Sequence, residues 1–127
     1  MIGRLKRRAE FLQVAAANRK WVAPGLILQV RRQHTSESRS DDAPRAAPLE
    51  AVRVGFTASR KVGNSVKRNR ARRRLRAVAA EVLGHAEPGM DFVLIARPAT
   101  IERDYRALVG DLVAGLKRLK LYRGQDS

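Results

Sequence analysis

Two spacings of apolar residues alternate along the chain and predict its secondary structure. Apolar positions three and four residues apart predict helices over residues 4–17, from about 64 to 84 and from about 101 to 119. Alternating or unbroken apolar runs predict strands over residues 26–32, 52–59 and 91–96. The chain is therefore predicted to mix helices and strands within one core.

The predicted strand over residues 52–59 has two different faces. One face carries the apolar residues Val52, Val54, Phe56 and Ala58, and the other carries Arg53, Gly55, Thr57 and Ser59. A face of glycine and small hydroxyl residues leaves room for a ligand backbone. We therefore expect the second face to be open to an extended polymer.

The segment from Arg60 to Arg76 carries the strongest charge in the sequence. Nine of its seventeen residues are basic, and no acidic residue occurs between Glu50 and Glu81. Helical spacing predicts an N-cap at Asn64 or Ser65 and an end near Gly84. The predicted buried stripe consists of Ala71, Leu75, Val78, Ala79 and Val82, and the opposite side carries Asn69, Arg70 and Arg73.

This cationic face opposes folding of the helix by itself. Six like-charge pairs three or four residues apart destabilise the free helix by on the order of 1–3 kcal/mol. A solvated helix face usually mixes both signs of charge. A solvated surface is the alternative interpretation, but so dense a run of one sign favours a polyanionic partner.

Composition narrows the class of protein. A chain of 127 residues with a formal net charge of +15 predicts one nucleic-acid-binding domain, residues 1–127. No apolar run is long enough to span a membrane, and no membrane or small-molecule partner is expected. The N-terminus has no apolar signal region, so we expect a cytoplasmic protein. Residues 34–49 are predicted to form a flexible loop and residues 120–127 a flexible tail.

The sequence offers little chemistry for catalysis. It has no cysteine, and its two histidines, His34 and His85, lie in separate segments. Asp41 and Asp42 could hold a cation, but solvated charge is the better interpretation in a loop without a third ligand. We find no catalytic motif and no metal site, so the chain is predicted to bind nucleic acid rather than to cleave it alone.

Two aromatic residues near the N-terminus each have two possible roles. Phe11 lies beside the predicted apolar stripe of the first helix, which consists of Leu5, Ala9, Leu12 and Ala16. It is predicted either to be a core aromatic or to offer a base a stacking surface at a cleft. Trp21 is predicted to be a core residue or a cap over the first helix.

Residues 53–76, RVGFTASRKVGNSVKRNRARRRLR, resemble the signature of the protein component of bacterial ribonuclease P. The hallmark of that family is an R-N-R motif on a basic helix, which here is Arg68-Asn69-Arg70. The segments RLKRRAEF (residues 4–11) and DFVLIAR (residues 91–97) resemble its flanking elements. The resemblance covers nearly the whole chain except residues 33–48.

The resemblance implies a particular fold. It is a single-domain α+β sandwich in the order α-β-β-β-α-β-α, of the ribosomal protein S5 domain 2-like type. The basic helix lies in a left-handed β-α-β crossover in that fold. General rules of chain topology alone would have predicted a right-handed crossover.

The resemblance also implies a function within a ribonucleoprotein. The RNA subunit would cleave the 5′ leader from precursor tRNA with Mg²⁺ held mainly by RNA, so no cofactor is expected on the protein. The protein would bind the single-stranded leader in a cleft between the sheet and the first helix. It would dock on the catalytic RNA through the basic helix, and lower the magnesium requirement.

The family's binding residues map onto three groups. The motif helix supplies Arg68, Asn69, Arg70, Arg72, Arg73 and Arg76, and the strand-to-helix junction supplies Ser59, Arg60, Lys61 and Asn64. Phe11 corresponds to the leader-contacting aromatic. Ala15 and Gln29 stand where members often have aromatic residues, which implies weaker stacking of the leader. Tyr122 is a further candidate for the cleft.

Two other functions are consistent with so basic a composition. One is a structural or ribosomal RNA-binding protein without a role in processing, and the other is a metal-dependent nuclease that acts alone. Cleavage of precursor tRNA in the presence and absence of a ribonuclease P RNA separates these three functions.

Overall fold

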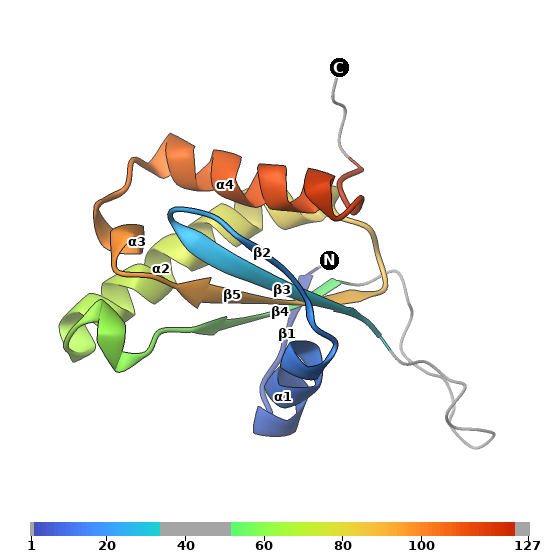
Figure 1. Ribbon diagram of the computed structural model, residues 1–127, viewed down its shortest axis with the longest axis horizontal. Coiled ribbons are helices and arrows are strands. Elements are labelled where there is room, and N and C mark those ends of the chain that lie inside the picture. The colour runs from blue at the N-terminus through green and yellow to red at the C-terminus, as the bar shows by residue number, and fades with distance from the viewer. Residues whose placement is uncertain (1, 34–51, 124–127) are drawn as a thin grey trace.

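The structure is a computed structural model that describes residues 2–33 and 52–123. Figure 1 shows a twisted sheet with helices on both faces. The predicted loop at residues 34–49 lies outside the described residues, as do residues 124–127 of the predicted tail. Residues 121–123 pair with residues 85–87, through Glu87 N–H to the Leu121 carbonyl at 2.7 Å and Arg123 N–H to the His85 carbonyl at 2.6 Å.

Within the described residues, five strands form one sheet in the order β1-β4-β5-β3-β2. Their bounds are β1 (Ile2–Arg4), β2 (Arg19–Val22), β3 (Leu26–Arg32), β4 (Val52–Thr57) and β5 (Met90–Ala96). The central strand β5 runs parallel to β4 and antiparallel to β3. The short strand β1 pairs in parallel with β4, and β2 pairs with β3 as a hairpin.

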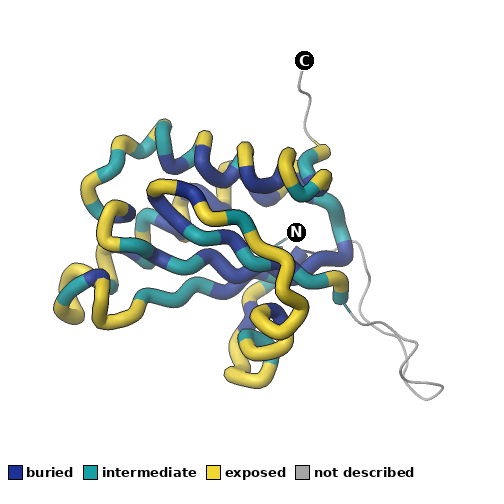
Figure 2. The backbone as a smooth tube through the Cα atoms, in the orientation of Figure 1, coloured by how far each residue is buried: buried dark blue, intermediate teal, exposed yellow. Residues whose placement is uncertain are grey.

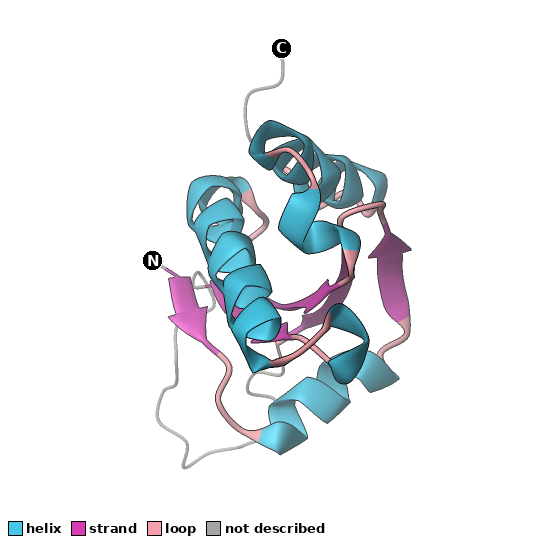
Figure 3. Cartoon of the chain, turned by 90° about the vertical axis from the view of Figure 1, so that its left-hand side faces the viewer, coloured by secondary structure: helices cyan, strands magenta, loops and turns pink. Residues whose placement is uncertain are grey.

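Helices cover the sheet in two layers, which Figures 1 and 3 show from two directions. On one face lie α2 (Ser65–Val82), the short α3 (Ala99–Glu102) and α4 (Tyr105–Arg118). On the other face lies α1 (Arg8–Ala16). The chain leaves β4, returns through α2 and enters the neighbouring parallel strand β5, and the two views show this crossover to be left-handed. The α+β fold and its order of elements are confirmed, with β1 and α3 as short additions.

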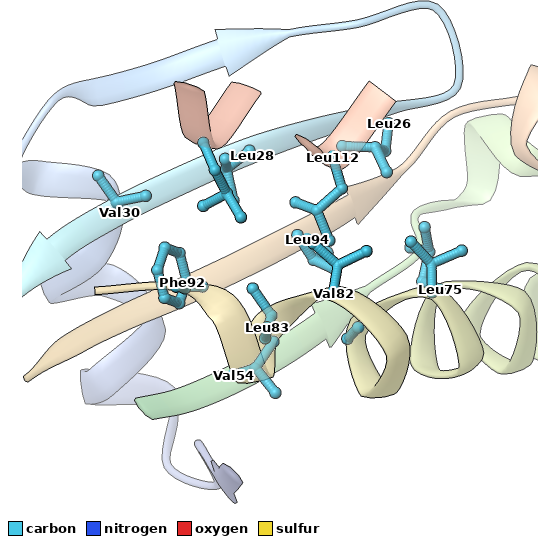
Figure 4. Packing of buried hydrophobic residues seen from close by; sticks show 14 of the residues in the cluster. Leu26, Leu28, Val30, Val54, Leu75, Val82, Leu83, Phe92, Leu94 and Leu112 are labelled. Carbon is cyan, nitrogen blue, oxygen red and sulfur yellow. The ribbon is translucent and has the colours of Figure 1, made fainter. Parts of the chain in front are cut away.

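The main core lies between the sheet and the layer of α2 and α4. Leu28, Leu75, Phe92, Leu94 and Leu112 are fully buried in it, and Figure 4 shows their side chains meeting from both layers. Burying each such side chain contributes about 1.5–3 kcal/mol. A smaller cluster of Leu5, Val14 and Val93 lies under α1. Figure 2 shows correspondingly that α1 is mostly exposed along its length.

The prediction for the basic helix is confirmed in detail. All five residues of its predicted stripe, from Ala71 to Val82, are buried. Asn64 is the N-cap, and its Oδ1 accepts a hydrogen bond from the Lys67 N–H at 2.9 Å. The strands over residues 26–32 and 91–96 are also confirmed, the second beginning one residue earlier.

The prediction for the first helix was wrong at its start and on its buried side. Residues 2–4 form strand β1, and the helix begins at Arg8. Leu12 is 56% exposed, whereas Val14 is fully buried. The alanines of this segment fit several helical faces almost equally well, so spacing could not identify the packed side.

The last predicted helix is divided in two. It breaks at residues 103–104 between α3 and α4, where the Asp104 carboxylate accepts a hydrogen bond from the Arg106 N–H at 3.1 Å. Trp21 lies in β2 against Gly115 of α4 and does not cap the first helix. The guanidinium of Arg118 lies 5.3 Å from its ring centroid.

Candidate nucleic-acid interface

The outward face of α2 carries cations that have no carboxylate partner in the described part of the chain. Asn69, Arg70, Arg73 and Arg76 are exposed. Within residues 2–33 and 52–123, every ion pair lies elsewhere, and none includes a residue of the segment 60–76. Glu81, the one acid in α2, pairs with Arg106 at 3.2 Å. The face therefore presents uncompensated positive charge to solvent.

Two shallow, open grooves run along this face of α2. One is lined by Val66, Asn69, Arg72, Arg73 and Arg76. The other is lined by Arg70, Arg73, Arg74, Ala77 and Tyr105. Arg73 borders both grooves. An extended phosphate backbone lying in either groove would meet guanidinium groups along its length.

The predicted residues of the motif helix do not all face the same way. Arg72 donates from Nη2 to Asn69 Oδ1 at 2.7 Å, so Asn69 orients that guanidinium. Arg68 is half-buried and donates to the Gly63 carbonyl at 3.3 Å. Arg74, which is not among the predicted binding residues, donates to the carbonyls of Ile101 and Arg103, so it anchors α3. Arg68 thus lies nearer the junction than the outer face.

The predicted junction residues gather where β4 passes into α2. Ser59, Arg60, Lys61 and Asn64 are all exposed around a 3₁₀ turn whose Val62 is buried. Ser59 Oγ accepts a hydrogen bond from the Lys61 N–H at 3.2 Å. This turn fixes the backbone that presents Arg60 and Lys61 beside the first turn of α2.

Gly63 joins this turn to α2 and has a φ of 139°. A Cβ atom there would lie 2.7 Å from Lys67 Cδ. The left-handed backbone and the close approach of Lys67 both favour glycine at this position.

Phe11 packs from α1 onto the small-residue face of β4. A Cβ atom on Gly55 would lie 2.5 Å from two ring atoms of Phe11. Gly55 is buried, so the expectation that this whole face of the strand is open was wrong at Gly55. Phe11 is itself half-buried, packing against the cluster of Leu5, Val14 and Val93. It therefore contributes to the smaller core while keeping part of its ring accessible.

An ion network that the sequence analysis missed holds α1 on the sheet. Asp91 of β5 is fully buried and accepts two hydrogen bonds from Arg53 of β4, both at 2.8 Å. Arg53 also reaches Glu10 of α1 at 3.1 Å. The hydrogen bond to Asp91 raises the pKa of Arg53. From β3, on the other side of β5 from β4, Arg31 lies 3.6 Å from Asp91 and donates to Gln13 of α1 at 3.3 Å.

Glu10 also closes the N-terminal turn of α1, which makes the stability of the protein depend on pH. Its Oε1 accepts from the Arg7 N–H at 3.1 Å and the Lys6 N–H at 2.9 Å. The bond from Arg7, aided by the Lys6 N–H and Arg53, holds the pKa of the Glu10 carboxyl below its usual range. A carboxyl with a lowered folded pKa stabilises the protein above its unfolded pKa and loses that stabilisation as pH falls through the folded pKa.

We expect Glu10→Gln to reduce the loss of stability on acidification. Denaturant unfolding at neutral pH and at about pH 3 measures the difference for the wild type and the variant. An equal loss in the two proteins would show that Glu10 is not a source of this acid sensitivity.

The remaining predicted cleft residues lie in different places. Ala15 is exposed on α1, and Gln29 is half-buried on β3. Tyr122 packs against the main core and lies 6.3 Å, ring to ring, from His85. That position belongs to the layer of α2 and α4, so Tyr122 does not line the face beneath α1.

Residues 2–33 and 52–123 contain no candidate metal site and no candidate membrane span. No three His, Cys, Asp or Glu residues within these ranges are grouped so that they could bind a metal ion. No helix in the described part of the chain has the length and apolar character needed to cross a bilayer.

Comparison with known proteins gives a consistent result. The family model for Ribonuclease P matches residues 3–120. The Ribonuclease P protein component of Paramagnetospirillum magneticum is 52% identical over 119 residues, covering 93% of this chain and 83% of the relative. That of Gluconacetobacter diazotrophicus is 48% identical over 117 residues, covering 91% and 89%.

Solved structures share the fold. The RNase P protein from Thermotoga maritima has a TM-score of 0.69 at 23% identity, covering 91% of this chain and 96% of that one. The Staphylococcus aureus RNase P protein also has a TM-score of 0.69, at 21% identity, covering 94% and 96%.

Proposed function

The chain belongs to the ribonuclease P family, and on that premise we propose how its two surfaces work within the ribonucleoprotein. It is a protein component of this endoribonuclease of tRNA processing, and as such it associates with the ribonuclease P RNA. We propose that α2 and the junction dock on that RNA. The face between α1 and the sheet would bind the 5′ leader of precursor tRNA in the cytoplasm.

The uncompensated cationic face of α2 is the observation that carries the proposal. Guanidinium groups form bidentate contacts with phosphate, and such contacts give affinity without reading sequence. Because no carboxylate among the described residues pairs with the segment 60–76, its charge is available to a polyanion. RNA neutralises the same like-charge repulsion that opposes the free helix.

The proposed role in turnover is to position the substrate and to screen charge. Holding the leader and the catalytic RNA on one rigid body places the scissile phosphate near the RNA's metal sites. Neutralising phosphates also lowers the concentration of Mg²⁺ that the RNA needs, while the ions themselves are held mainly by the RNA. The protein supplies no reacting group in this scheme.

Reconstitution at low magnesium tests the proposal. The purified protein is mixed with a bacterial ribonuclease P RNA and precursor tRNA at a magnesium concentration where the RNA alone is slow. We expect the protein to restore release of the 5′ leader and to cleave nothing specifically without the RNA. A protein that binds the RNA but restores no cleavage would be a structural RNA-binding protein instead.

Phe11→Ala is expected to weaken binding of substrates that carry a leader and to leave mature tRNA almost unaffected. Base stacking on an aromatic side chain contributes about 1–3 kcal/mol, so the holoenzyme should lose roughly ten- to hundredfold in affinity for precursor tRNA. Titration of both tRNA forms with the reconstituted holoenzyme measures the ratio.

Leu12→Ala is the matched control, because Leu12 is the exposed neighbour of Phe11 on α1. Thermal unfolding of both variants reports the packing lost under α1. Equal losses of affinity for precursor and mature tRNA would assign Phe11 to the core alone.

A further inference from the structure

Two arginines from different elements converge on one aromatic ring at the edge of the sheet. The guanidinium carbon of Arg4 in β1 and that of Arg76 in α2 each lie 5.7 Å from the ring centroid of Phe56. Phe56 is half-buried in β4, and both arginines are exposed. Cations are attracted to the face of an aromatic ring, so Phe56 positions both guanidiniums at this edge of the sheet.

The register of the sheet places Arg4 on the same face as α2. Arg4 pairs with Val54 in the parallel ladder of β1 and β4, and side chains of paired residues point to the same side. Val54 belongs to the main core under α2. Arg4 therefore points toward the layer of α2 and away from the face under α1.

Arg76 links the ring of Phe56 to one of the two grooves of α2. Arg76 lines the groove of α2 that also contains Asn69 and Arg73. The ring of Phe56 contacts both Arg76 and Arg4, which lies on the edge strand. Within residues 2–33 and 52–123, neither Arg4 nor Arg76 forms an ion pair with a carboxylate. The positive charge of α2 thus extends past the helix to the first strand.

We propose that Arg4 is an RNA-binding residue, and that Arg4 and Arg76 bind neighbouring phosphates of one RNA strand that crosses Phe56. The partner is the catalytic RNA, because Arg4 shares a face with α2 and not with α1. This inference rests on the proposed docking of α2. It extends the interface to the edge strand β1, and it gives a role to two guanidiniums that flank one ring and have no carboxylate partner within residues 2–33 and 52–123.

Salt titration of binding to a ribonuclease P RNA, without tRNA, tests the assignment. The logarithm of the binding constant falls linearly with the logarithm of the salt concentration, and each lost phosphate contact makes this negative slope flatter by about 0.7–0.9. We expect this decrease for Arg4→Gln and for Arg76→Gln, and roughly twice the decrease for the double variant. Arg4→Lys keeps the charge and should restore most of the slope.

Two further variants make the outcome specific. Arg32→Gln removes an exposed arginine on β3, three strands away from β1, and should leave the slope unchanged. Arg70→Gln tests docking of α2 itself. If Arg4→Gln has the wild-type slope while Arg70→Gln has a flatter one, only the role of Arg4 is overturned and the docking of α2 stands. An unchanged slope for both would overturn the proposed docking of α2 as well.

A purely structural role for Arg4 predicts a different result. If Arg4 only packed on Phe56, Arg4→Gln would lower the unfolding temperature and leave the salt slope intact. Thermal unfolding of each variant in the absence of RNA therefore accompanies the titration. A reduced slope in a variant that is still folded at the titration temperature supports the phosphate contact.

Discussion

Replacing Arg70 and Arg73 together by glutamine is expected to weaken binding of the catalytic RNA strongly. Both side chains are exposed on α2, and Arg73 borders both grooves. Hydrogen bonds to charged groups contribute about 1.5–3 kcal/mol each, or roughly ten- to hundredfold in Kd per contact. The salt slope should fall by about 1.4–1.8 for two lost phosphate contacts.

The same double substitution should leave the free protein at least as stable as the wild type. Arg70 and Arg73 take part in like-charge pairs with each other and with Lys67, Arg74 and Arg76. Each such pair destabilises a helix by about 0.2–0.5 kcal/mol, and glutamine is nearly as good a helix former as arginine. A gain in stability together with a loss in affinity would identify the arginines as residues kept for binding.

Denaturant unfolding without RNA and titration with labelled RNA measure the two effects separately. The matched control is Arg32→Gln, which should change neither quantity by much. Destabilisation by the Arg70 and Arg73 substitutions would mean that these side chains support the fold. In that case, reduced RNA affinity could no longer be assigned to lost phosphate contacts.

The basic helix was predictable because several independent signals agree there. Its apolar stripe follows a helical period, Asn64 is a good N-cap, and the charged positions fall on the other side. Arg68 and Arg74 show what periodicity leaves out. Their side chains are long enough to turn back to main-chain carbonyls at Gly63, Ile101 and Arg103. The direction of a flexible side chain depends on tertiary neighbours that a period does not contain.

The edge elements were harder to predict because they depend on partners distant in sequence. Strand β1 is only three residues long and exists through its pairing with β4, about fifty positions later. Strand β2 depends in the same way on the hairpin with β3. Neither segment has an apolar period long enough to be recognised without those partners. The left-handed crossover came from the family resemblance, since general rules favour the opposite hand.

The ion pair of Arg53 and Asp91 shows a second reason why part of the structure could not be predicted from the sequence. The sequence presents Arg53 as one more cation near the basic segment and Asp91 as the polar start of an apolar run. Only the register of the parallel strands, in which Arg53 stands beside Asp91, brings the two charges together. A buried acid at the start of a central strand is nevertheless a usable signal, because such a group requires a partner.

Removing the charge of Asp91 should therefore produce the largest loss of stability among the described ion pairs. Asp91 is fully buried and accepts both of its short hydrogen bonds from Arg53. Breaking a buried pair costs about 3–5 kcal/mol, and we expect Asp91→Asn to lie near the lower end because Arg53 is 36% exposed. A mobile Arg53 also weakens its ion pair with Glu10, so α1 should separate from the sheet before the rest of the fold opens.

Denaturant unfolding and amide hydrogen exchange of α1 test this expectation. The control is Glu87→Gln, whose partner Arg123 lies 3.7 Å away in a half-exposed pair, and which should change stability by no more than about 1 kcal/mol. A double variant, Asp91→Leu with Arg53→Met, should recover only part of the loss, because apolar replacement removes both members of the buried pair but leaves Arg31 without Asp91 and Glu10 without Arg53.

The functional consequence separates this network from the RNA-docking face. Arg53 pairs with Glu10, and Glu10 and Phe11 are neighbours on α1. If Arg53 becomes mobile, the ring of Phe11 should therefore lose its packing against Gly55. Asp91→Asn should then weaken binding of precursor tRNA more than binding of the catalytic RNA, provided that measurements are made below the unfolding temperature of the variant. A loss of stability no greater than that of Glu87→Gln would show that the pair does not anchor α1. Equal losses of affinity for both RNAs would show that its effect is on the whole fold.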